Sequence, residues 1–203
     1  MAYKIVLDAG HGGEDPGAVY KDRKEKDDNL KLTLAVGKIL EENGVDVVYT
    51  RTTDIYQTPF EKAKAANEAG ADFFISFHRN SSSKPEQYNG VEVLVYDKKG
   101  IKYQMAQNIL GALGELGFRE LGVKERPGLV VLRRTKMPAL LIIFRSASRL
   151  PIATRICQSD WYPACTGLSI PGFRFPYVSP QFCHTAVQES PPVVHRLRLS
   201  SSP

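Results

Sequence analysis

Residues 3–13 read YKIVLDAGHGG, a short apolar run that ends in a glycine-rich polar loop. A run of this length followed by Ala-Gly is typical of a buried strand that opens into a loop. Residues 29–42 then place leucine, valine and isoleucine mainly on one helical face, and the Asn-Gly pair that follows is a stop signal. Residues 45–50, VDVVYT, predict a second strand.

The alternation continues with an amphipathic helix over 58–69 and a strand over 73–77, which gives the order βαβαβ. This order at this spacing predicts a sheet that is mostly parallel and twisted, with right-handed crossovers and helices on both faces. The remaining predicted elements are a strand at 91–96, a helix at 103–116, and apolar runs at 129–132 and 139–143. We therefore expect an α/β fold with a mostly parallel, mixed sheet of about six strands.

The composition of the chain fits a globular protein. It has 203 residues, 42% hydrophobic and 24% charged, with a net charge of +5. Apolar runs stay far below the roughly 20 residues that a membrane-spanning helix needs, so an integral membrane protein is not expected. The N-terminus carries one lysine and a short apolar run that is interrupted by Asp8, and we interpret it as a strand and not a signal peptide.

The amino-acid composition of the sequence changes after Ile143. Residues 1–138 hold 21 Lys and Arg against 20 Asp and Glu, residues 139–203 hold 6 against 2, and residues 144–203 contain no lysine. We predict a domain at 1–143 and an irregular tail rich in Pro, Arg and Ser at 144–203. The tail is a linker with a partly folded appendage, a small module, or the product of a shifted reading frame. Its arginines match no nucleic-acid-binding module, so no nucleic-acid partner is expected.

Two histidines follow predicted strands at their carboxyl ends, His11 after YKIVLDAG and His78 after FFISF. Ligands collect at this edge of a parallel sheet. Glu25 joins them if the loop before the first helix reaches the same edge. Two histidines and a glutamate are a common ligand set for catalytic zinc, which activates water and polarises amide carbonyls. Hydrogen-bonded loop histidines and a solvated glutamate are the competing interpretation.

Three segments resemble the motifs of the zinc-dependent N-acetylmuramoyl-L-alanine amidases: VLDAGHGGEDPGA, EKDDNL and FISFHRN. The resemblance covers about residues 3–142, with the motifs in the family's order. It implies that His11, Glu25 and His78 bind zinc, and that Asn80 helps to shape the substrate site behind His78. It also implies a substrate, the amide between the lactyl group of muramic acid and the L-alanine of the peptidoglycan stem peptide. Asp8 would orient a zinc ligand by accepting a hydrogen bond from it, without touching the metal.

The chain departs from the family pattern at three positions. Lys62 stands where the family usually has arginine, and Arg79 stands where a small residue is common. Arg79 contacts the anionic stem peptide or is solvated, and we favour a solvated side chain. After residues 137–142, MPALLI, the family has a glutamate that acts as general base and acid, and Ile143 occupies its place.

Isoleucine cannot transfer a proton, so we expect impaired hydrolysis unless Glu14 or Glu92 substitutes. The catalytic residue of this chain is therefore unassigned. The alternative is a zinc-containing module that binds peptidoglycan without cutting it. In either case we expect a monomer that meets the stem peptide and glycan at the bacterial cell wall, reached by export or by release on lysis.

Overall fold

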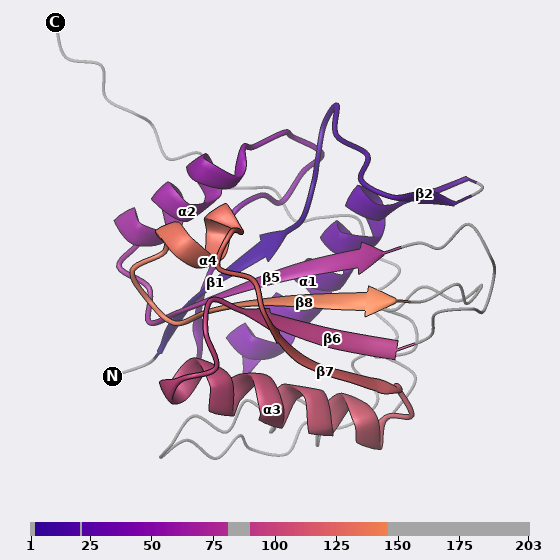
Figure 1. The fold of residues 1–203 in the computed structure, drawn as a ribbon. Coiled ribbons are helices and arrows are strands. Elements are labelled where there is room, and N and C mark those ends of the chain that lie inside the picture. The colour runs from indigo at the N-terminus through magenta and orange to yellow at the C-terminus, as the bar shows by residue number, and fades with distance from the viewer. Residues whose placement is uncertain (1–2, 21, 81–89, 146–203) are drawn as a thin grey trace, which may run out of the picture.

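The computed structural model describes residues 3–20, 22–80 and 90–145. Within them, six strands form one twisted sheet (Figure 1). Their spatial order is β4 (Asp46–Tyr49), β1 (Lys4–Ala9), β5 (Phe73–Asn80), β8 (Ala139–Arg145), β6 (Gly90–Val95) and β7 (Glu120–Glu125). A small antiparallel pair, β2 (Val19–Tyr20) and β3 (Arg23–Lys24), lies outside the sheet. The predicted tail at 144–203 lies almost entirely outside the described residues.

The sheet is mixed, as the sequence predicts. Strands β4, β1, β5 and β8 run parallel to one another, and β6 pairs antiparallel with β8 and parallel with β7. The carboxyl ends of β1 and β5 and the start of β6 therefore meet at one edge of the sheet. We call this end of the strands the carboxyl edge.

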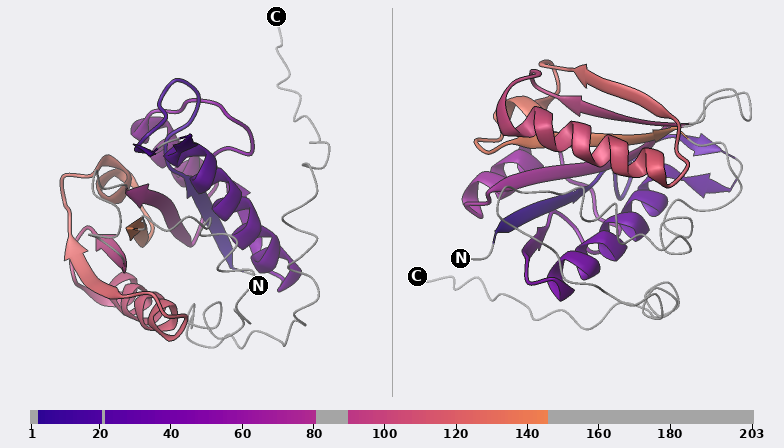
Figure 2. Two further views of the ribbon diagram at one scale, coloured as in Figure 1. Left: turned by 90° about the vertical axis from the view of Figure 1, so that its right-hand side faces the viewer. Right: turned by 90° about the horizontal axis from the view of Figure 1, so that it is seen from below.

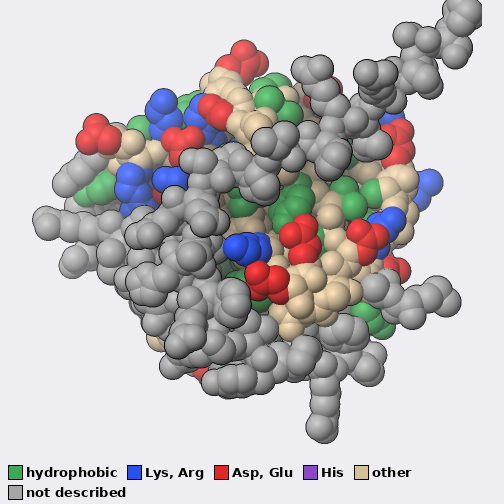
Figure 3. Space-filling model, turned by 180° about the vertical axis from the view of Figure 1, so that it is seen from behind, with side chains coloured by type: hydrophobic (Ala, Val, Ile, Leu, Met, Phe, Trp, Pro, Cys, Tyr) green, Lys and Arg blue, Asp and Glu red, His purple; other side chains and the backbone are tan. Residues whose placement is uncertain are grey.

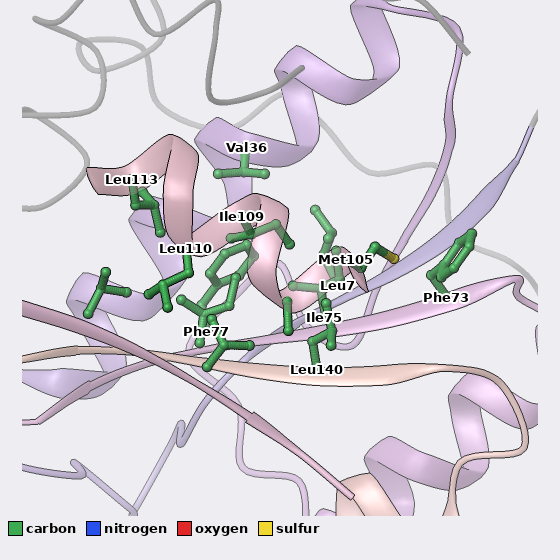
Figure 4. Close-up of a cluster of buried hydrophobic side chains, with 14 of the residues drawn as sticks. Leu7, Val36, Phe73, Ile75, Phe77, Met105, Ile109, Leu110, Leu113 and Leu140 are labelled. Atoms are coloured by element: carbon green, nitrogen blue, oxygen red, sulfur yellow. The ribbon is translucent and has the colours of Figure 1, made fainter. Parts of the chain in front are cut away.

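Helices cover both faces, as the two turned views show (Figure 2). Helices α1 (Glu25–Glu42) and α3 (Gly100–Glu115) pack on one face, and α2 (Pro59–Glu68) and α4 (Val130–Arg134) pack on the other. Figure 4 shows the larger core, where Val36 of α1 and Ile109 of α3 lie over Ile75 and Phe77 of β5. Burial of these side chains supplies most of the stabilising free energy of the sheet and its helices.

The residues in the first turns of α1 and α2 explain where these two helices begin. Three carboxylates occupy the first turn of α1, where the helix dipole favours negative charge. Helix α1 begins at Glu25, four residues before the predicted start. Thr58 and Glu61 form a capping box at the start of α2, with Pro59 as the first helical residue. None of the described helices has the length and apolarity to cross a membrane.

The predicted count of about six strands is confirmed, but it included the apolar run at 129–132 as a strand, and that assignment is wrong. This run forms the start of α4, because four apolar residues fit one buried turn of helix as well as a strand. The sixth strand is instead β7, ELGVKE, at the edge of the sheet. Its four inner residues are only partly buried and it contains Gly122, so its sequence gives a weak strand signal.

Candidate metal centre

Three side chains that could hold a metal ion converge at the carboxyl edge. His11 lies in the loop after β1, His78 lies near the end of β5, and Glu25 is the first residue of α1. Strands β1 and β5 are parallel neighbours, so their ends are adjacent. One ligand atom from each of the three residues lies within 4.8 Å of the others. The structure therefore brings together the three residues that the sequence predicts at one edge of the sheet.

The carboxylate of Glu25 lies between the two imidazole rings. Its Oε1 is 3.2 Å from Nε2 of His11 and 3.0 Å from Nδ1 of His78. The backbone N–H of Arg79 donates to the same oxygen at 2.9 Å, and that of Ala18 donates to Oε2 at 2.8 Å. The carboxylate is therefore fixed from the protein side and faces two ring nitrogens.

Glycines give the rings their space. A Cβ on Gly10 would lie 2.4 to 2.7 Å from three atoms of the His78 ring. A Cβ on Gly17 would lie 2.6 Å from the ring of His11, and Gly17 also has a φ of +63°. His11 itself has a φ of 63°, which a residue with a side chain rarely adopts. Strain of this kind persists where the surrounding structure enforces it, and it is common at functional sites.

Asp15 is a site residue that sequence reasoning missed. Its Oδ2 is 2.7 Å from Nδ1 of His11, which leaves Nε2 as the nitrogen directed at Glu25. A carboxylate on the outer nitrogen fixes the ring orientation and is the common arrangement for a metal-bound histidine. The only signal in the sequence is the spacing of four residues inside a glycine-rich loop, and that signal is weak.

The electrostatics of the cluster favour a cation. Burial alone would raise the pKa of Glu25, but the hydrogen bonds from His11, His78 and Ala18 outweigh burial and hold that pKa far below its usual range. Burial alone would lower the pKa of His11, but contacts with Glu25 and Asp15 outweigh it, so this pKa is raised. The two carboxylates thus stabilise positive charge between them. One carboxylate with two imidazole nitrogens is a donor set that zinc accepts, and the residues present therefore fit that metal.

A buried arginine holds the loop that leads to His11. The guanidinium of Arg51, 2% exposed, donates to the carbonyls of Ala9 and Gly10 at 3.1 Å and of Lys26 at 2.8 Å. It therefore ties the segment before His11 to the start of α1. The role of Arg51 was not predicted from the sequence.

Asp8 is buried and is bonded to residues from neighbouring elements. It accepts hydrogen bonds from Thr50 at 2.8 Å and Ser76 at 2.6 Å, and its Oδ1 lies 2.8 Å from Nζ of Lys62. Lys62 also donates to the carbonyl of Ala9. The carboxylate of Asp8 thus joins β5, the end of β4 and α2, and it is Asp15 that is hydrogen-bonded to a histidine of the cluster.

Two residues that follow His78 have different environments. Arg79 is 2% exposed, so the expectation of a solvated side chain is wrong: its Nε lies 2.7 Å from Asp28, and it donates to the carbonyl of Ala18 at 3.0 Å. Contact between Arg79 and a stem peptide stays a prediction and would require these bonds to break. Asn80 is exposed at the end of β5, and its role in shaping the substrate site also stays a prediction.

Ile143 lies directly beside His78 in the sheet. The register pairs Ile143 of β8 with His78 of β5 on one side and with Glu92 of β6 on the other. Glu92 is therefore two strand spacings from His78, roughly 10 Å. It is buried and bonded to Lys124 and Arg145. Glu14, the other named substitute, is exposed in the loop after His11.

Comparison with known proteins identifies the class to which this fold and site belong. Residues 5–148 match the model of the N-acetylmuramoyl-L-alanine amidase family, and the chain belongs to this family. The chain is 37% identical over 142 residues to the sporulation-specific N-acetylmuramoyl-L-alanine amidase of Bacillus subtilis (strain 168), which is 68% of this chain and 54% of that protein. It is 36% identical over 146 residues to the endolysin of Bacillus phage SPP1, covering 70% of this chain and 54% of that protein.

The solved structures agree with the fold. The crystal structure of N-acetylmuramoyl-L-alanine amidase from Clostridium difficile 630 has a TM-score of 0.70 and 28% sequence identity, and the match covers 82% of this chain and 92% of that chain. The catalytic domain of CwlV, N-acetylmuramoyl-L-alanine amidase from Bacillus (Paenibacillus) polymyxa var. colistinus, gives a TM-score of 0.69 at 28% identity, covering 82% of this chain and 94% of that chain. The chain spans about half the length of the curated relatives that it matches.

Proposed function

We propose that this chain is a zinc-dependent peptidoglycan amidase domain that acts on the amide between N-acetylmuramic acid and the L-alanine of the stem peptide. The observation that carries the proposal is the convergence of His11, Glu25 and His78 within 4.8 Å at the carboxyl edge. Membership of the amidase family and the similarity to the two relatives described above support the choice of substrate.

His11, through Nε2, Glu25 and His78, through Nδ1, would hold the metal. When bound, zinc supplies Lewis acidity, which polarises the scissile carbonyl and makes water more acidic. The role of the protein is orientation: Asp15 holds the ring of His11, and the N–H groups of Ala18 and Arg79 hold the carboxylate of Glu25. This fixed geometry costs little reorganisation when the substrate arrives.

Proton transfer is the step that this chain lacks. Ile143 occupies the family's glutamate position, beside His78 in the sheet, and its side chain can neither accept nor donate a proton. Glu92 is a poor substitute, because burial would raise its pKa but Lys124 and Arg145 outweigh burial and lower it. A carboxylate held in its charged form by two cations is a weak base. We therefore expect hydrolysis to be slow, with zinc binding intact.

The test is release of soluble stem peptide from purified peptidoglycan by zinc-loaded protein, with an Ile143→Glu variant and an EDTA-treated control. Positioned acid-base groups contribute typically 10²- to 10⁴-fold, so we expect the variant to exceed the parent by about this factor. Cleavage by the parent at the variant's rate would mean that another group transfers the proton. Zinc binding without cleavage by either protein would contradict the amidase proposal for this chain.

The second candidate function is a zinc-containing module that binds peptidoglycan and does not cut it. Ile143 is the observation that favours it, since the substitution removes proton transfer and leaves His11, Glu25 and His78 in place. Retention of intact peptidoglycan by the parent chain, without release of stem peptide, would favour this function. In both cases the proposed place of action is the bacterial cell wall, and the proposed working form is a monomer.

A further inference from the structure

An exposed apolar surface lies beside the metal centre. Among the described residues, Ile55, Tyr56 and Phe60 are 48%, 45% and 59% exposed; the first two lie in the segment that joins β4 to α2, and Phe60 lies in the first turn of α2. Scattered exposed hydrophobic residues are normal, but these three lie within six residues of one another along the chain, and exposed apolar side chains that gather in one place are typical of interaction sites. We call these three residues the patch. The patch is not part of the hydrophobic clusters on either face of the sheet.

The patch is joined to the loop that carries His11. A Cβ on Gly12 would lie 2.1 Å from the carbonyl oxygen of Ile55, and one on Gly13 would lie 2.7 Å from the backbone nitrogen of Tyr56. The N–H of Gly13 also donates to Asp54 at 2.7 Å. The two loops therefore form one continuous rim, and Tyr56 is packed against the residues that directly follow His11.

The other side of the metal centre has a different character. In the sheet order β4-β1-β5-β8-β6-β7, the strands beyond β5 carry Arg145 and Lys124, whose side chains are 30% and 40% exposed. These two cations face the single carboxylate of Glu92, so this group has a net positive charge. A stem peptide carries carboxylates, and a positive group suits it better than an uncharged aromatic surface.

We propose that Ile55, Tyr56 and Phe60 form the binding surface for the glycan strand of peptidoglycan, while the stem peptide extends toward Arg145 and Lys124. The inference rests on the proposed function, because the bond to be cut joins sugar to peptide and the two parts must leave the metal in different directions. Sugar rings present C–H faces that stack on aromatic rings, and their hydroxyls reach water at the ring edge. Tyr56 offers the same combination of an apolar body and a polar tip.

The test measures binding of the full chain to glycan strands stripped of stem peptide and, separately, to free stem peptide. Phe60→Ser and Tyr56→Ser are the test variants, and Tyr96→Ser is the matched control. Tyr96 is 41% exposed and follows the last residue of β6, at the end of this strand that lies away from the carboxyl edge. We expect each test variant to weaken glycan binding by about tenfold, since loss of an interface aromatic commonly costs more than 1 kcal/mol. Stem-peptide binding and the control variant should stay at the parent's values.

Unchanged glycan affinity in Phe60→Ser overturns the inference, as does a parent chain that binds no glycan or a variant that loses stem-peptide binding instead. If Tyr56→Ser fails to fold because Tyr56 packs on Gly13, the more exposed Phe60 decides alone. Zinc titration of the same samples separates the two proposals. Zinc binding without glycan binding rejects only the glycan surface, and glycan binding through Phe60 without zinc binding rejects only the metal centre.

Discussion

Glu25 and Glu92 are two buried carboxylates near the same edge of the sheet, and they differ in their partners. Glu25, 5% exposed, faces the ring nitrogens of His11 and His78. Glu92, 2% exposed, is bonded to Lys124 and Arg145. Both pKa values are lowered despite burial, which would raise them.

This difference indicates which of the two carboxylates is available to bind a metal. A histidine can release its proton near neutral pH and then present a lone pair to a metal beside Glu25. Lysine and arginine stay protonated at that pH and have no lone pair to offer, so the charge of Glu92 is already compensated. The partners, more than the burial, distinguish a candidate ligand from a structural ion pair. On the face seen from behind, acidic and basic side chains are visible among the described residues and no histidine is (Figure 3).

The largest expected effect is on zinc affinity. Glu25→Gln should weaken zinc binding about a thousandfold, because one of three ligands is lost and structural zinc sites in small proteins typically bind with about 10–16 kcal/mol in total. Glu92→Gln, the matched change, should leave the affinity within about threefold of the parent's. Competition titration with a fluorescent chelator measures both. Equal losses in the two variants would erase the proposed difference between the carboxylates.

Asp8 extends the comparison, since its partner is also a lysine. Lys62→Met should lower the free energy of unfolding by about 3 kcal/mol, because it leaves the buried carboxylate of Asp8 without its cation. The matched control is Lys64→Met, whose partner Glu68 lies 3.7 Å away at the surface and whose loss should cost about 0.5 kcal/mol or less. Urea unfolding at pH 7 distinguishes them. A similar cost in both variants would mean that the Asp8 to Lys62 pair contributes no more than a surface pair.

Ring placement can be tested apart from charge. Gly10→Ala should displace the His78 ring and lower zinc affinity by about 10- to 100-fold, since its Cβ would lie 2.4 Å from the ring. Gly111→Ala is the control: Gly111 lies inside α3 with no neighbouring atom within 4 Å, and the change should stabilise the fold by about 0.5–1 kcal/mol. Unchanged zinc affinity in Gly10→Ala would show that the ring moves freely.

Parts of this site could be predicted from the sequence because they depend on local order. His11 and His78 follow apolar strands, and strands that alternate with helices at this spacing become parallel, so the two histidines meet. Glu25 needed the family resemblance, since its charged neighbours are also typical of a solvated loop. Asp15 and Arg51 depend on loop geometry, and a loop conformation leaves little trace in a sequence without periodicity.

The elements of the fold also differ in how far the sequence predicts them. The strands at the centre of the sheet have continuous apolar runs and were predicted, whereas the edge strand β7 has exposed ends and a central glycine and was not. The run at 129–132 was misassigned because four apolar residues contain no full helical period. Arg79 was misjudged for a related reason: its burial depends on Asp28 and Ala18, which come from a different part of the chain.

The smallest expected effect concerns the pH dependence of Glu92. Its carboxyl group has a lowered pKa in the folded state, so the folded protein binds fewer protons than the unfolded chain between the two pKa values. The stability that this group contributes is therefore present above the ordinary pKa of 4.5 and is lost as the pH falls through the lowered value. Glu92→Gln should cost about 1–2 kcal/mol at pH 7, because Lys124 and Arg145 lose a charged acceptor but remain partly solvated.

The cost of Glu92→Gln should narrow as the pH falls below 4.5, since the carboxyl group is then protonated in the unfolded chain first and in the folded protein at its lowered pKa, where it resembles the amide. Urea unfolding of parent and variant over a pH series measures it, with Glu68→Gln as the exposed control. A cost that stays constant on acidification would mean that Glu92 stabilises the sheet by packing and not by its charge. The two buried carboxylates would then differ in chemistry for a reason other than the cations around Glu92.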